Sequence, residues 1–325
     1  MNSRSDFTEV FPEILPGIVS QNPIMIKLAG YLKKISASDG AVFLNGETGT
    51  GKELFASAIH QLSGRLGKIV CVNCGAIPES LFESLFFGHE KGSFTGADRK
   101  QHGFFYQANE GTLFLDEIAE LPLMHQAKLL RVLESRKFSR IGGSEVLDFT
   151  GRIVSASHQS LEQLVEGKEF REDLWYRLNL FEVAIPSLHQ RRDDIPLLAR
   201  CFAMSSGRIT LAPCALQLLQ SSEWPGNIRQ LKNTIDKLAV LADNQYVSAD
   251  TIRQLAMVAE PVDCATRVAK EIIDMPITNK LKTIYDALIE QAVEISHGNK
   301  SEAARLLGVH RKVIERRMAQ IHIVR

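Results

Sequence analysis

A glycine-rich segment between an apolar run and a helical pattern constrains the fold of this chain most. The apolar run covers residues 41–44 and the helical pattern residues 53–61. The segment between them reads Gly46-Glu47-Thr48-Gly49-Thr50-Gly51-Lys52 and is followed by Glu53. Backbone N–H groups of such a loop can cradle phosphates, and Lys52 can reach the outer phosphates of a nucleotide. The usual Ser or Thr after the lysine is absent, so a glycine turn with a chance lysine is the alternative on this segment alone.

A second apolar run ends in two adjacent acids, Leu113-Phe114-Leu115-Asp116-Glu117. Asp116 at the carboxyl end of a strand can hold Mg²⁺ through water, and Glu117 can orient and deprotonate an attacking water molecule. Two acids also end many ordinary solvated strands. Together with the upstream phosphate loop, however, they favour a site that binds and hydrolyses ATP with Mg²⁺.

The order of the apolar runs predicts the fold class. Short strands alternating with helical patterns indicate a parallel sheet, whereas the part after Pro186 contains helical patterns alone. The expected strands cover residues 41–44, 69–72, 112–115, 152–156 and 181–185. The expected later helices cover residues 195–205, 214–221, 228–242, 249–257 and 281–296. Residues 258–278 have poor periodicity and two prolines, which is typical of a linker.

Charge and cysteine content exclude several classes of protein. Lys and Arg together number 38, as do Asp and Glu, so no whole-chain field attracts nucleic acid or membrane. Neither a signal peptide nor an apolar stretch of membrane-spanning length is visible, so we expect a cytoplasmic protein without a membrane partner. Five scattered cysteines fit reduced thiols. Cys71 and Cys74 form a C-x-x-C without a second pair, which favours two thiols at a strand end over a redox or zinc site.

The segment Gly92-Ser93-Phe94-Thr95-Gly96-Ala97 resembles the GAFTGA loop of sigma-54-dependent transcriptional activators, with Ser93 in place of an alanine. An aromatic and a hydroxyl between glycines make a mobile tip with an apolar contact group. The alternative is a turn whose Phe94 is tucked into the core. The resemblance extends over about residues 17–255 and again over residues 299–318. It implies an α/β AAA+ P-loop ATPase, with its parallel sheet sandwiched by helices, and an α-helical lid.

The resemblance also assigns roles to residues outside these motifs. Asn73 corresponds to a switch residue that restrains Glu117; a buried Asn satisfied by backbone is its alternative. Arg171 and Arg177 correspond to arginine fingers that act on a neighbouring subunit, with surface ion pairing as the alternative. Arg229, at the start of a lid helix, corresponds to the sensor II arginine near the γ-phosphate. Residues 14–18 are candidates to cover the adenine.

One position departs from the family pattern. The family usually has Ala-Thr-Asn at the end of the fourth strand, the sensor I site, whereas this chain has Ala156-Ser157-His158. Ser157 keeps a hydroxyl, but His158 replaces an amide with a group that can carry charge near neutral pH. The sensing hydrogen bond is therefore expected to differ from that of the family.

The C-terminal residues look like a Fis-type helix-turn-helix. Residues 298–325 hold seven basic and two acidic side chains, so this end is electropositive. Ala303 and Ala304 permit close helix crossing, and Gly308 makes the turn. A basic surface helix without a DNA role is the alternative. The expected DNA-binding residues are Lys300, Ser301, His310, Arg311, Lys312 and Arg316. The amphipathic helix before them is expected to form the dimer contact that matches a palindromic enhancer.

We therefore predict a sigma-54-dependent activator made of five segments. These are a short N-terminal segment (1–16), an α/β ATPase subdomain (17–187), an α-helical lid (188–257), a linker (258–278) and a helix-turn-helix domain (279–325). The resemblance implies a homo-oligomer, from a dimer to a hexameric ring. Its ATP hydrolysis would convert the closed complex of sigma-54 RNA polymerase into an open one. Because the ATPase begins near Met1, no receiver domain is expected among these residues, and either a regulatory protein acts in trans or the sequence is a piece of a longer chain. The alternative is an AAA+ DNA-binding regulator or remodeller that does not act on sigma-54.

Overall fold

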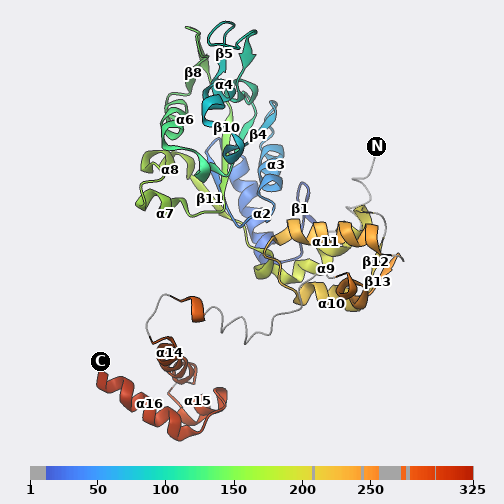
Figure 1. The fold of residues 1–325 in the computed structure, drawn as a ribbon, viewed down its shortest axis with the longest axis vertical. Helices are drawn as coiled ribbons and strands as arrows, with labels where there is room; N and C mark the ends of the chain where they lie inside the picture. The colour runs from blue at the N-terminus through green and yellow to red at the C-terminus, as the bar shows by residue number, and fades with distance from the viewer. Residues whose placement is uncertain are drawn as a thin grey trace. The chain divides into compact units, whose positions relative to one another are not determined.

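The computed structural model describes residues 12–206, 209–242, 245–255, 272–275, 279–296 and 298–324. Contacts between residues divide the chain into two compact units, Met1–Glu260 and Pro261–Arg325. The first unit contains a parallel sheet with helices and then a group of helices, and the second is a small helical unit (Figure 1). Each unit is described by itself.

The first unit is built on a five-stranded parallel sheet in the order β11-β3-β10-β7-β4. These strands are β3 (Val42–Asn45), β4 (Ile69–Asn73), β7 (Thr112–Asp116), β10 (Arg152–Ser157) and β11 (Phe181–Ala184). All five strands predicted from the apolar runs are therefore present, within one residue at each end. Because the strands are parallel, their carboxyl ends meet at one edge of the sheet, where ligands of such folds bind.

Helices cover both faces of this sheet, as the apolar patterns of the strands require. Successive strand residues point to opposite faces, so Val42 and Leu44 pack on one side and Phe43 on the other. The first face is covered by α2 (Pro23–Ser36) and α3 (Lys52–Leu62). The second face is covered by α6 (Leu123–Ser135) and α8 (Glu172–Leu178). This arrangement confirms the predicted sandwich of a parallel sheet between helices.

Smaller elements complete the α/β part of the first unit. A two-stranded hairpin, β1 (Glu13–Leu15) and β2 (Ile18–Val19), precedes α2. The short helices are η1 (Cys74–Ala76), η2 (Glu79–Leu81), α4 (Phe82–Phe87), α5 (Phe104–Gln107), η3 (Ile118–Glu120) and α7 (Leu161–Glu166). Two hairpins, β5 (Gly88–His89) with β6 (Gln101–His102) and β8 (Lys137–Ser139) with β9 (Val146–Asp148), lie at one end of the unit (Figure 1). A bridge between His89 and Ile141 joins them.

The second part of the first unit is helical, as expected after Pro186. It consists of η4 (Leu188–Asp194), α9 (Ile195–Ser205), α10 (Pro213–Ser221), α11 (Asn227–Leu241) and α12 (Ala249–Gln254). A short parallel pair, β12 (Thr210–Leu211) and β13 (Tyr246–Val247), joins its loops. Its core is separate from the two cores of the sheet and includes Leu198, Trp224 and Leu231. Helix α11 begins immediately after Pro225 and Gly226, as these residues predict.

The second unit contains α14 (Lys280–Ile295), α15 (Lys300–Leu306) and α16 (Arg311–Val324). Asn299 caps α15 by accepting hydrogen bonds from the N–H groups of Ser301 and Glu302. Most of the predicted linker, residues 258–271 and 276–278, lies outside the described residues. The five segment boundaries therefore stay a prediction. Within the part of the chain that the structure describes, no helix is both long and apolar enough to cross a membrane.

Candidate functional site

The phosphate loop connects β3 to α3 at the carboxyl edge of the sheet. Gly49 and Gly51 have φ values of +81° and +97°, a left-handed region that glycine adopts without steric cost. Lys52 begins α3, and its Nζ donates a hydrogen bond of 2.9 Å to the carbonyl of Gly46. The same Nζ lies 3.5 Å from Oε1 of Glu117. The loop and the acidic pair are thus brought together, as the two motifs predicted.

The two acids at the end of β7 have different environments. Burial and the charge of Glu117 raise the pKa of Asp116 above its ordinary value, although Lys52 opposes the shift. Burial also acts to raise the pKa of Glu117, but the hydrogen bond of His158 and the charge of Lys52 outweigh it, so this pKa is lowered. Neighbouring carboxyls with diverging pKa values are typical of sites where the two groups have different tasks.

His158 contacts Glu117 directly. Strand β10 lies beside β7 in the sheet, and His158 follows its last residue. Its Nδ1 is 2.6 Å from Oε2 of Glu117. The hydroxyl of the buried Ser157, in contrast, donates to the carbonyl of Gln159 and accepts from the N–H of Gln159. The departure from the family pattern therefore places a histidine on the predicted catalytic base, while Ser157 closes a local turn.

Asn73 lies next to the acidic pair but does not hold Glu117 in this structure. It ends β4 in register with Asp116. Its side-chain oxygen accepts a hydrogen bond of 3.0 Å from the N–H of Gly75 and so caps η1. The partners of Glu117 are instead His158 and Lys52. The predicted restraint by Asn73 is not formed here, and a switch role for this residue stays a prediction.

The two predicted finger arginines lie on or beside α8, and their hydrogen-bond partners are residues other than Asp116 and Glu117. Arg171 donates to both carboxylate oxygens of Asp173, at 3.0 and 2.7 Å. This hydrogen bond raises the pKa of Arg171. Arg177 donates from Nε and Nη2 to the carbonyl of Leu133, at 3.1 and 2.9 Å. Both side chains are exposed, which is the arrangement that action on a neighbouring subunit requires.

The start of the lid helix α11 contacts the phosphate loop through two residues. The N–H of Arg229 donates to the carbonyl of Gly49 at 3.2 Å, and the Arg229 side chain is exposed. Asn227 donates to Thr48 and to Glu47. The sequence motifs pointed to Arg229 but not to Asn227, although an Asn directly after Pro-Gly at a helix start could have indicated it. Arg191, which donates to the carbonyl of Thr50, was also missed.

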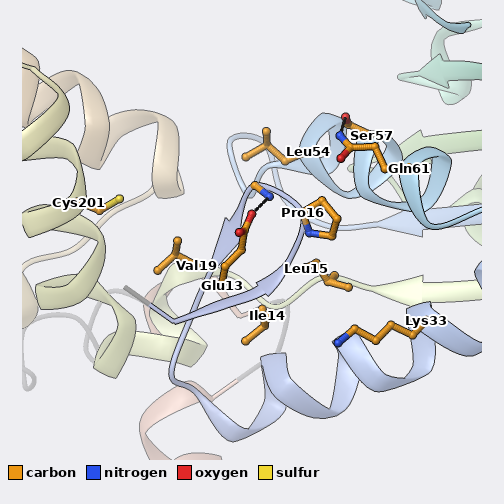
Figure 2. Close-up of a pocket in the computed structure, with 11 residues that line it drawn as sticks. Glu13, Ile14, Leu15, Pro16, Val19, Lys33, Leu54, Ser57, Gln61 and Cys201 are labelled. Atoms are coloured by element: carbon orange, nitrogen blue, oxygen red, sulfur yellow. Dashed lines mark hydrogen bonds between the residues drawn. The ribbon is translucent and has the colours of Figure 1, made fainter. Parts of the chain in front are cut away.

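Two cavities lie along α3, the helix that follows the phosphate loop, and the smaller one also borders Thr50 and Gly51 of the loop. The smaller cavity has a volume of about 90 Å³. Its apolar lining includes Leu54 and Phe55 of α3, Leu198 and Ile228 of the lid, and Ile18 of β2. A larger one of about 680 Å³ lies along the β1–β2 hairpin and is lined by Ile14, Leu15 and Pro16 of the hairpin and by Leu54 of α3 (Figure 2). The predicted adenine cover, residues 14–18, thus borders both cavities. An apolar slot next to a phosphate loop fits a flat base.

The loop of residues 92–97 forms a compact exposed turn. The N–H of Gly92 donates to the carbonyl of Ala97 at 2.8 Å, and Gly92 and Gly96 have left-handed φ values of +79° and +101°. Phe94 is 43% exposed, and its ring lies edge to face against that of His89, with centroids 5.0 Å apart. Phe94 is therefore not tucked into the core. Thr95 is also exposed.

The base of this turn is held by charged residues of both hairpins. The buried Arg140 donates to Glu90 at 3.0 Å and to Glu145 at 2.8 Å. Lys100 pairs with Glu90 at 3.0 Å. These ion pairs fix the ends of the turn while its tip is left exposed, an arrangement suited to contact with another molecule.

The predicted DNA-binding residues of the second unit lie on α15, on α16 and in the turn between these two helices. Ala303 and Ala304 are buried where α15 crosses the other helices, and Gly308 turns the chain with φ +64°. All predicted DNA-binding side chains are exposed: Lys300, Ser301, His310, Arg311, Lys312 and Arg316. Arg317 contributes differently, because it pairs with Asp286 of α14 and holds the unit together.

The C-x-x-C cysteines lie in β4 and in η1. Cys71 and Cys74 are free thiols, one exposed and one buried. Burial and the nearby acids raise the pKa of Cys74 to about 12, so it is protonated at neutral pH. No group of metal-ligating side chains is found among the residues that the structure describes.

Comparisons with known proteins assign each part. Residues 18–184 match the Sigma-54 interaction domain, residues 189–265 the AAA+ ATPase lid domain, and residues 286–320 the bacterial regulatory protein, Fis family. The chain is 41% identical over 305 residues to the transcriptional regulatory protein ZraR of Salmonella typhimurium, covering 92% of this chain and 67% of that protein. It is 40% identical to the regulatory protein AtoC of Escherichia coli, with coverages of 91% and 66%. It thus spans about two thirds of the length of these relatives.

A solved structure agrees with these matches. The crystal structure of NtrX from Brucella abortus in complex with ADP superposes with a TM-score of 0.67 at 29% identity, covering 98% of this chain and 72% of that one. An interaction domain that matches half of the chain, a lid and a Fis-type module follow one another in the order that the motifs predicted. The chain belongs to the family of sigma-54-dependent transcriptional activators and has the AAA+ P-loop ATPase fold.

Proposed function

We propose that this protein couples ATP hydrolysis to conversion of the closed complex of sigma-54 RNA polymerase into an open one. The observation that carries the proposal is the convergence of Lys52, Asp116 and Glu117 at the end of the sheet, in the same unit as an exposed Phe94–Thr95 tip. The site of hydrolysis and the contact tip are thus separate sites within one folded unit.

The substrate is bound by groups of this chain. The N–H groups of the loop and Lys52 would hold the phosphates, with Gly46 to Glu53 as the binding segment, and Arg229 would reach the γ-phosphate from the lid. The NtrX structures with ADP and with ATP are consistent with a nucleotide in this fold. The apolar cavity next to Ile18 and Leu54 would take the base.

The acidic pair fits a Mg²⁺ ion, because Mg²⁺ is bound by oxygen ligands such as carboxylates. Asp116 offers such a carboxylate close to Lys52 of the phosphate loop. Asp116 would hold the ion through water, and bound Mg²⁺ would supply charge neutralisation of the phosphates. Glu117 would take the proton of the attacking water, and Ser157 and His158 would report on the phosphate through the same edge of the sheet. His158 and Lys52 keep Glu117 ionised, the form that a base requires.

The remaining partners follow from the other exposed residues. Arg171 and Arg177 would complete the site of a neighbouring subunit, which requires a ring of several copies, up to a hexamer. The tip from Gly92 to Ala97 would contact sigma-54 in the cytoplasm. Lys300, Arg311 and the other exposed basic residues of the second unit would bind enhancer DNA, with α14 in the dimer contact.

The test is open-complex formation at a sigma-54 promoter with purified protein. The wild type is expected to open the promoter only with ATP. Glu117→Gln keeps the size of the side chain but removes the base, so it is expected to bind ATP, hydrolyse it at least about a hundredfold more slowly and leave the promoter closed. Opening by Glu117→Gln at the wild-type rate would overturn the proposed coupling.

A further inference from the structure

Three consecutive carbonyl groups of the phosphate loop accept hydrogen bonds from the lid. Asn227 Nδ2 donates to Thr48 at 3.0 Å, the N–H of Arg229 to Gly49 at 3.2 Å, and Arg191 Nη2 to Thr50 at 3.3 Å. A peptide unit is planar and trans, so each carbonyl and the N–H joined to it point in opposite directions. Holding these carbonyls toward the lid therefore turns the N–H groups of the loop to its other side.

Loop and lid also meet backbone to backbone. A Cβ on Gly49 would lie 2.2 Å from the carbonyl oxygen of Gly226, so no side chain fits between them. At such close contact a displacement of the start of α11 also displaces the loop, because packed protein interiors leave little free volume to absorb it.

Asn227 holds the centre of this contact and satisfies its whole amide there. Its Nδ2 donates to Glu47 Oε2 at 3.0 Å as well as to Thr48, and its Oδ1 accepts from the N–H of Leu188 at 2.7 Å. The residue is 1% exposed and has a left-handed φ of +51°. A side chain with two donors and an acceptor that also tolerates this backbone is that of Asn.

We propose that Asn227 is a positioning residue of the ATP site, which sets the shape of the phosphate loop through Glu47 and Thr48 according to the position of the lid. This inference rests on the proposed ATPase function. Asn227 acts on the loop and not on the nucleotide, so its removal changes ATP affinity by releasing the loop. The amide thus couples lid movement to nucleotide binding.

The test measures ATP affinity by calorimetry in full-length variants. Asn227→Asp keeps the acceptor for Leu188 but places a carboxylate against Glu47 and the carbonyl of Thr48. ATP binding is expected to weaken on the order of tenfold to a hundredfold, as for a buried polar group that loses its partner. Asn233→Asp makes the same charge change at an exposed position of the same helix and is expected to bind like the wild type.

A second substitution distinguishes positioning from a general role in folding. Glu47→Gln supplies an amide that can donate to the carboxylate of Asn227→Asp, so the double variant is expected to regain at least about threefold in affinity over Asn227→Asp alone. Equal affinities for the double and the single variant would overturn the inference, as would an Asn227→Asp variant that binds ATP like the wild type. If the wild type itself binds no ATP, the proposed function fails instead.

Discussion

The contact between His158 and Glu117 predicts an unusual pH dependence of ATP hydrolysis. The Glu117 carboxylate is held by His158 and Lys52, and its lowered pKa keeps it ionised as the pH falls through the usual range of glutamate. Titration of Glu117 therefore does not limit the rate near neutral pH. The hydrogen bond and charge of His158 are among the causes of this lowered pKa, and histidine as a residue type changes charge between about pH 5 and 8, so the hold on Glu117 is expected to tighten at acid pH and to withhold the carboxylate from water.

The size of the effect follows from the exposure of the two side chains. Two unit charges about 4 Å apart attract by about 1 kcal/mol in water and about 4 kcal/mol at an effective dielectric constant of 20. The His158 side chain is 39% exposed and that of Glu117 20%, so we take the lower figure. About 1 kcal/mol corresponds to about fivefold in rate. The wild-type rate is expected to rise about fivefold more between pH 5.5 and 8 than that of His158→Asn.

The assay is steady-state ATP hydrolysis at saturating ATP across this pH range. Protonation of Asp116, whose pKa is raised, can also lower the rate at the acid end of the profile. This decrease is common to the wild type and His158→Asn, so it cancels in the ratio of their rates. His189→Asn is the matched control, since His189 also lies beside a glutamate, Glu223, but at 3.5 Å and in the lid. Superimposable profiles for the wild type and His158→Asn would refute the reasoning.

Three further predictions follow from the separate positions of the sites. Thr95→Ala is expected to keep ATP hydrolysis within about twofold and to abolish open complexes, because Thr95 lies on the exposed tip; normal transcription would contradict this. Removal of residues 279–325 is expected to eliminate the specific DNA footprint while ATPase activity is kept, since the second unit has its own core. Arg177→Ala is expected to lower hydrolysis on the order of a thousandfold while ATP still binds. Mixing the Arg177→Ala and Lys52→Ala proteins is expected to restore part of the ATPase activity. Arg171→Ala is tested with Lys52→Ala in the same way. If mixed rings form and neither mixture regains activity, a site shared between subunits is excluded.

The agreement between sequence and structure is greatest where the functional residues are contiguous. Three motifs are of this kind: the phosphate loop, the acid pair at the end of β7 and the turn of residues 92–97. Within each motif the residues follow one another directly, so one short segment determines both the local fold and the side chains presented there. The same holds for the inner strands β7 and β10, whose apolar runs are buried on both faces.

Contacts between distant segments were not predictable in this way. Whether Phe94 is exposed or buried depends on what packs around the turn, which the composition of the turn does not specify. Asn73 was expected to hold Glu117, yet the polypeptide offers its side chain a nearer partner in the N–H of Gly75. A short polar side chain often bonds to backbone two residues away, and this local bond competes with a distant one.

By itself, then, the sequence determined the α/β fold, the order of the parts and the family, because these depend on local patterns and contiguous motifs. Only the tertiary structure decided which groups contact Glu117 and the phosphate loop. His158 reaches Glu117 across 41 residues because β10 and β7 are neighbours in register, and Asn227 reaches Glu47 across 180 because α11 packs on the phosphate loop. Such pairs depend on strand register and helix packing, which the whole chain sets together, so no single segment encodes them.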